Sequence, residues 1–269
     1  MSVITISRGS FSGGKMLAEC LSKALGYRCV DREVIVERAA ARGVSQEELR
    51  DALQKPPTFL ERLQHKKYLY MVLIQAALAA EVRDGRAVYH GNAGHLLLKG
   101  GPHVLRVRII APIELRVTMA RERLKLSRAE ALDYIDKMDQ DRRKWVHYLY
   151  GVDWGDASNY DIVLNLESIQ IKEACQTIST LARQRCFEFT PACRAAMDDL
   201  ALAGRVRAEL ALDNATSHLE FDVQAKDGAV CIRGAVSHLR EVTDVQRIAA
   251  GVPGVATLNL DELASPVRS

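Results

Sequence analysis

The chain has 269 residues, of which 48% are hydrophobic and 26% are charged, and its formal net charge is +3 at pH 7. These values are ordinary for a globular protein and allow one large domain or two modest ones. So small a positive charge does not indicate a nucleic-acid-binding protein, and we expect no nucleic-acid partner.

A short strand and a helix flank a glycine-rich loop at the start of the chain. The apolar run at residues 3–6 predicts a buried strand, and residues 15–25 place apolar side chains on one helical stripe. Between them, Gly9 is followed after four residues by Gly14 and Lys15, which fits the first seven positions of G-x-x-x-x-G-K-[ST]. The backbone N–H groups of such a loop, together with the helix N-terminus, favour a bound phosphate.

This loop is the predicted site for the phosphates of a nucleotide, with the Lys15 ammonium reaching the transferred group. Met16 stands where a serine or threonine would hold magnesium, so either Ser10 or Ser12 supplies that hydroxyl or the metal is held through water and acidic residues. The alternative interpretation is a tight strand-to-helix turn that binds nothing. The candidate nucleotide-binding residues are Gly9, Ser10, Ser12, Gly13, Gly14, Lys15 and Met16.

Two further predicted strands, at residues 27–30 and 87–90, each end in a polar loop. The residues that follow them are candidates for binding the phosphate acceptor: Asp31, Arg32, Gly91 and Asn92. Asp31 either orients the acceptor or a metal-bound water, or caps the following helix. Arg32 is assigned to the acceptor's phosphate and Asn92 to a base or ribose.

Helical sequence separates these strands. A helix is predicted from Arg32 to about Arg42, a capping box S-x-x-E begins another at Ser45, and the pair of prolines at 56 and 57 ends it. The apolar stretch at residues 68–80 is too short to span a bilayer and predicts a buried helix.

Residues 104–110 and 161–164 predict the fourth and fifth strands, with a helical hairpin between them. A capping box at Ser127 begins the second arm of the hairpin. The arginines of the two arms are Arg116, Arg121 and Arg123 on the first, and Arg142 and Arg143 on the second. Arg121 and Arg142 are the candidates for stabilising a transferred phosphoryl group, and the alternative is a solvated helix surface with ion pairs.

Other polar residues of this half favour structural roles. Asp136 and Asp139 lie on one helical face with Arg142 and are expected to hold that arginine rather than a metal. His90 and His95 are five residues apart with no third ligand in sequence, which does not indicate zinc; each either lines the acceptor pocket or packs in the core.

The regular alternation of strand and helix predicts an α/β fold with a parallel five-stranded sheet, helices on both faces and ligands at the carboxyl ends of the strands. A change in composition after Arg185 marks a second, smaller domain. Its predicted elements are a helix at 200–212, strands at 219–224 and 229–233, a helix at 241–250 and a strand at 256–260. Asp227 and Gly228 between the first two strands indicate a β-hairpin.

Residues 1 to about 185 resemble the cytidylate kinase-like family of P-loop nucleoside monophosphate kinases. The residues that carry the resemblance are Ile4 to Arg8, Ser12 to Gly14, Gly26-Tyr27, Asp31 to Glu33, Asp136-x-x-Asp139-x-x-Arg142, Trp154-Gly155, Asn159 to Asp161, and Asn165. The chain departs from the pattern at Phe11, where many members have glycine, at Lys15, where they have arginine or histidine, and at Asn92, where they have arginine.

The C-terminal part resembles a BON domain at Gly228, Gly234 and residues 252–255. Such domains are read as modules that associate with a ligand, a protein or a membrane surface, and the alternative is an inert appendage. The resemblances predict a kinase-like domain at residues 1–188, a linker at 189–195 and an α-β-β-α-β BON-like domain at 196–269.

The kinase resemblance implies ATP-dependent, magnesium-assisted phosphoryl transfer to a nucleoside monophosphate. CMP or dCMP is the acceptor that it favours. Two alternatives stay open: a non-catalytic nucleotide sensor coupled to the BON-like module, and a kinase of another small acceptor. Six cysteines without metal spacing, at 20, 29, 175, 186, 193 and 231, indicate reduced thiols. No pattern typical of a secretory signal peptide, with a charged segment followed by an apolar one, precedes the first predicted strand. Together with the reduced thiols, this predicts a cytoplasmic protein.

Overall fold

The computed structural model describes residues 2–54 and 66–264, which form two compact units. The first, called here the α/β unit, takes residues 2–34, 53–54 and 85–189. The second takes residues 35–52, 66–84 and 190–264.

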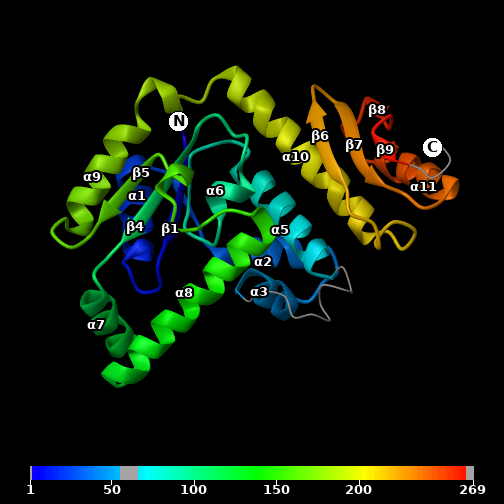
Figure 1. Ribbon diagram of the computed structural model, residues 1–269. Coiled ribbons are helices and arrows are strands. Elements are labelled where there is room, and N and C mark those ends of the chain that lie inside the picture. Colours follow the sequence, from blue (N-terminus) through cyan, green and yellow to red (C-terminus); the bar gives the residue numbers. More distant parts are fainter. Residues whose placement is uncertain (1, 55–65, 265–269) are drawn as a thin grey trace. The chain divides into compact units, whose positions relative to one another are not determined.

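The α/β unit contains a sheet of five parallel strands in the order β2-β3-β1-β4-β5 (Figure 1), as the alternation of strand and helix predicted. The strands are β1 (Val3–Arg8), β2 (Arg28–Val30), β3 (Ala87–Tyr89), β4 (Val104–Ile110) and β5 (Ile162–Asn165). Strand β1 is longer than predicted because Ser7 and Arg8 continue its pairing with β4. The phosphate loop therefore begins only after Arg8.

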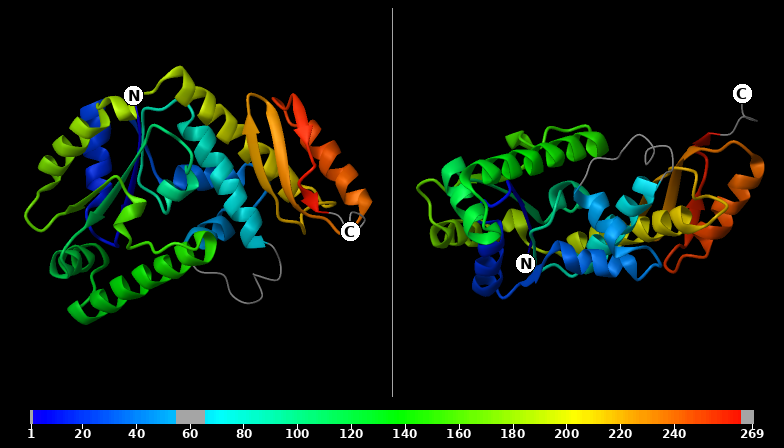
Figure 2. Two further views of the ribbon diagram at one scale, coloured as in Figure 1. Left: turned by 45° about the horizontal axis from the view of Figure 1, so that its top comes forward. Right: turned by 90° about the horizontal axis from the view of Figure 1, so that it is seen from below.

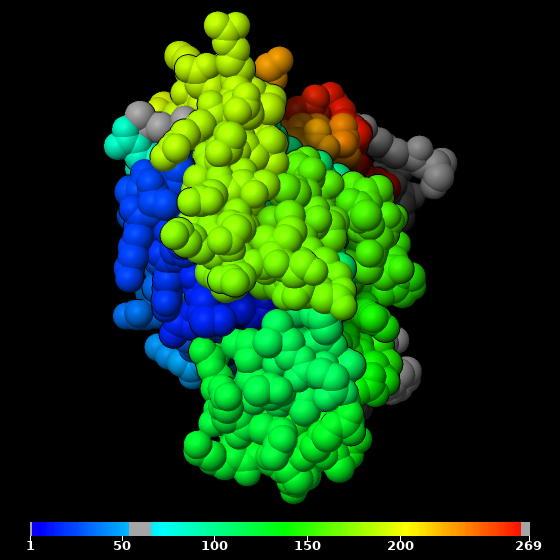
Figure 3. Space-filling view, turned by 90° about the vertical axis from the view of Figure 1, so that its left-hand side faces the viewer, coloured from blue at the N-terminus to red at the C-terminus, as the bar shows by residue number. Residues whose placement is uncertain are grey.

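The two faces of β1 have different environments because its side chains alternate. Ile4 and Ile6 face a core that they share with α1 (Gly14–Leu25) and α9 (Ile171–Ala182). Figure 3 shows the outer surfaces of these two helices beside each other. Ser7 faces the opposite way, into a polar cluster that includes Tyr160.

The predicted helical hairpin is formed by α7 (Ile113–Leu124) and α8 (Arg128–Tyr150), here called the lid hairpin (Figure 2). Ser127 and Glu130 make the predicted capping box at the start of α8. The two helices enclose a small apolar cluster of their own: Val117, Ala120, Ala131 and Ile135. The unit's remaining helices are short: α6 (Gly94–Leu97), η1 (Ala157–Asn159) and η2 (Arg185–Phe187).

The helices between β2 and β3 are α2 (Arg32–Ala40), α3 (Gln46–Gln54) and α5 (Lys66–Val82), and most of their residues belong to the second unit. The predicted buried helix at residues 68–80 is confirmed, and the predicted stop at Pro56 and Pro57 lies outside the described residues. No helix in residues 2–54 or 66–264 has the length and apolarity to cross a membrane.

Helix α10 (Pro191–Leu212) packs along α5 within the second unit. It begins well before residue 200, where the sequence pattern placed its start, because Thr190 caps it and Pro191 occupies its first turn. The helix thus includes most of the predicted linker at 189–195. Helix α5 comes from the predicted first domain, but it belongs to the same compact unit as α10. The domain ranges 1–188 and 196–269 therefore remain a prediction from the sequence.

The rest of the second unit is a small mixed sheet with one helix. Its elements are β6 (Asp222–Lys226), β7 (Ala229–Ala235), α11 (Leu239–Ala250), β8 (Thr257–Asn259) and β9 (Leu263–Ala264). The predicted hairpin is confirmed: β6 and β7 pair antiparallel around Asp227 and Gly228, both of which have positive φ. The order α-β-β-α-β is also confirmed, with β9 as an addition.

We expect Ile178→Ala to destabilise the α/β unit by about 2–5 kcal/mol, because Ile178 is fully buried between α1, α9 and the sheet and its truncation leaves a cavity. Both tryptophans of the chain, Trp145 and Trp154, belong to this unit, so their fluorescence during urea unfolding reports on it. The control Leu115→Ala, on an exposed site of α7, should change stability by less than about 0.5 kcal/mol. Equal losses in both variants would contradict the described core.

Candidate functional site

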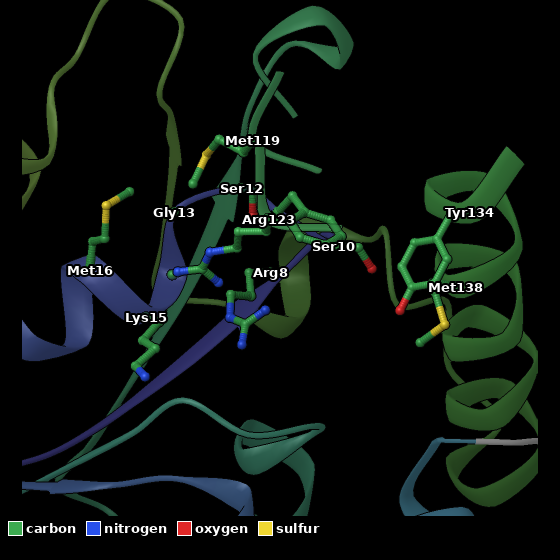
Figure 4. Close-up of a pocket in the computed structure, with 12 residues that line it drawn as sticks. Arg8, Ser10, Ser12, Gly13, Lys15, Met16, Met119, Arg123, Tyr134 and Met138 are labelled. Carbon is green, nitrogen blue, oxygen red and sulfur yellow. The ribbon is translucent and has the colours of Figure 1, made fainter. Parts of the chain in front are cut away.

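A cavity of about 210 Å³ lies at the start of α1, between the phosphate loop and the lid hairpin (Figure 4). Its lining combines loop residues, three cations and several apolar side chains: Arg8, Ser10, Phe11, Ser12, Gly13, Gly14, Lys15, Met16, Met119, Arg123, Tyr134 and Met138. None of these residues is acidic. The cavity is smaller than the pockets of whole drug-sized ligands and matches only a part of a nucleotide.

Three glycines shape the loop for different reasons. Gly13 has a φ of +83°, a conformation that side-chain-bearing residues rarely adopt. A Cβ at Gly14 would lie 1.9 Å from Cδ of Arg8, so the Arg8 side chain passes directly over this glycine. A Cβ at Gly9 would contact the Arg116 guanidinium at 3.1 Å. The loop therefore allows two arginines to approach its backbone.

The Asp139 carboxylate of α8 connects the lid hairpin to the loop. It accepts hydrogen bonds from the Ser10 backbone N–H at 2.9 Å and from the guanidinium groups of Arg116 and Arg142. Arg116 also donates to the Ser10 carbonyl at 2.8 Å. The prediction that Asp139 holds Arg142 is confirmed, whereas Asp136 accepts from Gln140.

Arg142 lies beneath the loop rather than in the cavity lining. It donates to the Arg8 carbonyl at 2.8 Å, and its guanidinium carbon is 5.2 Å from the centre of the Trp154 ring. Burial, opposed by the charge of Asp139, lowers the pKa of Arg142 to about 10. The group therefore stays charged at neutral pH.

The two arginines near the end of α7 have different positions. Arg123 lines the cavity, whereas Arg121 is exposed and is absent from the lining. Residues two positions apart on a helix point about 200° apart, so only one of the two faces the loop. Arg123, rather than the predicted Arg121, therefore takes the position that faces the phosphate loop.

The predicted acceptor residues lie outside the cavity lining. Asp31 accepts from the Val34 backbone N–H at 3.0 Å, which is the helix-capping alternative, and Arg32 pairs with Glu33. Asn92 donates to the Leu53 carbonyl at 2.6 Å. Gly91 approaches the Tyr89 ring so closely that a Cβ would lie 2.0 Å from the hydroxyl oxygen.

The lining offers magnesium little beyond the two serine hydroxyls. Ser12 donates its hydroxyl proton to the Gly9 carbonyl at 2.9 Å, which leaves oxygen lone pairs, and Ser10 is buried beside it. Met16 contributes a thioether, which magnesium does not favour. These residues fit a magnesium ion that arrives with the nucleotide and keeps phosphate and water oxygens as most of its ligands.

A polar cluster that sequence reasoning missed lies on the opposite face of β1. The Ser7 hydroxyl accepts from the Trp154 indole at 2.9 Å and lies 3.1 Å from the Tyr160 hydroxyl. Arg108 of β4 donates to the Trp154 carbonyl at 2.9 Å and stacks 4.2 Å from the centre of its ring. The signal in the sequence was an arginine at position 108 with apolar residues on both sides of it in a predicted strand.

His95 packs against this cluster, with its ring centre 4.6 Å from that of Tyr160. Both ring nitrogens are buried, and neither has a hydrogen-bond partner among the described residues. Burial, with the nearby charges of Arg108 and Arg106, lowers the pKa of His95 to about 3. Of the two roles considered for His95, packing in the core is therefore the one that the structure supports.

The sequence model of the cytidylate kinase-like family matches residues 3–168 of this chain, which include the loop, the sheet and the lid hairpin. The chain belongs to this family. The sequence model of the BON domain matches residues 198–261, within the second unit.

Individual relatives agree with this assignment. A cytidylate kinase of Pyrococcus horikoshii is 27% identical over 164 residues, which cover 61% of this chain and 79% of that protein. A cytidylate kinase of Ignicoccus hospitalis is 28% identical over 185 residues, covering 67% and 99%. A crystal structure of an uncharacterized protein from Eubacterium ventriosum has the same fold, with a TM-score of 0.55, 18% identity and coverage of 69% and 100%.

We expect Asp139→Asn to destabilise the α/β unit by about 3–5 kcal/mol, because two largely buried arginines lose their carboxylate partner. Urea unfolding followed by tryptophan fluorescence measures the change. Asp136→Asn, one turn earlier on α8 and exposed, is the matched control and should behave as the wild type. A stable Asp139→Asn protein would show that the carboxylate does not hold the hairpin to the loop.

His95 should make the stability of the α/β unit depend on pH. Its folded pKa of about 3 lies below the ordinary 6.5, so between these values the unfolded chain binds a proton that the folded chain does not. The free energy of unfolding therefore falls as pH falls through this window, by up to about 1.4 kcal/mol per pH unit.

His95→Phe should reduce this pH slope while keeping the ring contact with Tyr160. Urea unfolding at pH 6.5, 5.5 and 4.5 measures it, with His147→Gln, at an exposed site of α8, as the control that retains the wild-type slope. Identical slopes in wild type and His95→Phe would contradict a neutral, buried His95.

Proposed function

We propose that this protein is an ATP-dependent nucleoside monophosphate kinase that acts on CMP or dCMP with magnesium. Membership of the cytidylate kinase-like family supports a nucleotide kinase. The finer substrate assignment is supported by relatives that are named cytidylate kinases. We further propose that it works in the cytoplasm.

The observation that carries the proposal is the charge of the cavity. Arg8, Lys15 and Arg123 line it together with the N-terminus of α1, and no carboxylate does. A triphosphate chain is the complementary ligand, because it carries several negative charges and oxygens that accept from guanidinium, ammonium and amide donors.

These residues suit phosphoryl transfer, in which an oxygen of the acceptor's phosphate bonds to the γ-phosphorus while the bond to the ADP oxygen breaks. Lys15 and the loop amides would bind the donor phosphates and withdraw charge as it develops on the leaving oxygen. Arg123 takes the lid role in this proposal because it lines the cavity, and Arg142 positions the loop through the Arg8 carbonyl. Magnesium bound to the nucleotide would neutralise phosphate charge.

The acceptor is assigned to the region beyond Asp31, Arg32, Gly91 and Asn92. These residues follow β2 and β3 at the carboxyl edge of the sheet, where ligands of open parallel sheets bind. Only Arg32 among them carries a positive charge. Burial is the main cause that lowers the pKa of the Arg8 guanidinium, and the charge of Arg32 adds to it, so Arg32 lies near the cavity. This supports Arg32 as a contact for the phosphate of the acceptor.

Met16 supports one second candidate, a non-catalytic nucleotide sensor. The residue replaces the magnesium-binding hydroxyl of the phosphate-loop pattern, and it is 40% exposed at the cavity. In this alternative, nucleotide binding would change what the BON-like module associates with, a protein or a membrane surface.

Phosphate transfer from ATP with magnesium to a panel of nucleoside monophosphates tests the proposal on the full chain. We expect CMP or dCMP to be converted selectively. Lys15→Ala should lower kcat/KM at least about 100-fold with little change in Tm, because the side chain is 59% exposed and only loosely paired with Glu19 at 3.9 Å.

Lys23→Ala is the matched control, since Lys23 is exposed on the same helix, more than two turns from the loop. It should retain wild-type turnover. Undiminished turnover in Lys15→Ala would overturn the assigned role, and ATP binding without any transfer would favour the sensor.

A further inference from the structure

Arg8 is the last residue of β1, and its side chain is directed into the cavity (Figure 4). The aliphatic part crosses Gly14, where any side chain would collide with it, and the guanidinium emerges among the residues that line the cavity. Backbone pairing with β4 on one side and the Arg142 hydrogen bond to its carbonyl on the other fix the position of this residue.

The Arg8 guanidinium has no partner of its own in the described part of the chain. Its Nε atom is buried and lacks a hydrogen bond. The nearby charges of Arg32 and Arg123 repel it and, after burial, lower its pKa; the charge of Asp139 only partly opposes them. The Asp139 oxygens are already occupied by Ser10, Arg116 and Arg142.

A purely structural role does not explain this arrangement. A partly buried cation whose Nε has no hydrogen-bond partner costs stability, and a second cation facing the same space adds repulsion. An uncharged side chain of similar length would pack over Gly14 at lower cost. An anion between the two arginines would remove this cost.

We propose that Arg8 binds the phosphate chain of the nucleotide, pairing with Arg123 across the cavity. The two guanidinium groups come from opposite sides, Arg8 from the sheet and Arg123 from the lid hairpin. Each presents a planar fork of donors that matches two phosphate oxygens. The pair supplies part of the charge neutralisation that a hydroxyl-bound magnesium provides where position 16 is a serine or threonine.

The inference rests on the proposed function in assuming a polyphosphate ligand, but it requires neither catalysis nor a particular acceptor. Inorganic tripolyphosphate is therefore the probe, titrated calorimetrically into the full-length protein in EDTA, so that no divalent metal contributes. Thermal unfolding of each variant is measured with and without the probe.

Arg8→Gln should bind tripolyphosphate at least about 10-fold more weakly than the wild type. Without ligand it should be as stable as the wild type or more so, because an unpaired cation has been removed; a structural arginine would give the opposite change. Arg183→Gln, at an exposed arginine just after α9, is the matched control and should bind within twofold of the wild type.

Wild-type affinity in Arg8→Gln would overturn the inference, and so would equal weakening in Arg183→Gln. If Arg8→Gln does not fold, Arg8→Lys decides: it keeps the charge but not the fork, so a 3- to 10-fold loss supports the inference and wild-type affinity overturns it. Failure to transfer phosphate, together with Arg8-dependent tripolyphosphate binding, would reject the kinase proposal alone. Normal turnover with unaltered KM for ATP in Arg8→Gln would reject this inference alone.

Discussion

The hydrogen bonds of the Asp139 carboxylate determine how charge is distributed around the phosphate loop. One buried acid satisfies a loop amide and two arginines, so Arg116 and Arg142 lie close to the loop without facing the cavity as uncompensated charges. No acidic residue lines the cavity, so Arg8 and Arg123 have no carboxylate partner there and Lys15 has only a loose pair with Glu19 at 3.9 Å. The same interaction therefore anchors the lid hairpin and leaves the cavity positive.

Phe11 adds an apolar connection between the same two elements. Its φ of +59° is unusual for a bulky residue and costs about 1–2 kcal/mol. Its ring packs on the apolar cluster of the lid hairpin and lies 6.0 Å from the Tyr134 ring. Burial of the aromatic surface offsets the backbone strain, so Phe11 helps to hold the hairpin to the loop.

The sequence predicted the elements well and the site only in part. Alternation in the strands, the glycine loop and the capping box at Ser127 are local signals, and they identified the sheet and the hairpin. The choice between Arg121 and Arg123 was not local, because it depends on how α7 is rotated against the loop. The same holds for Arg8, whose significance comes from Gly14, Arg123 and the absence of an acid in the cavity lining, all of which require the folded chain.

The placement of the two cavity arginines relates ligand binding to the position of the lid hairpin. Arg8 belongs to a central strand of the sheet and is fixed by it, whereas Arg123 is on an exposed part of α7. The charge of Arg123 repels that of Arg8, so an anion bound between them would be attracted by the sheet and by the lid hairpin at once. Asp139 and Phe11 meanwhile hold the hairpin to the loop, so the two cationic side chains project from elements that are attached to each other.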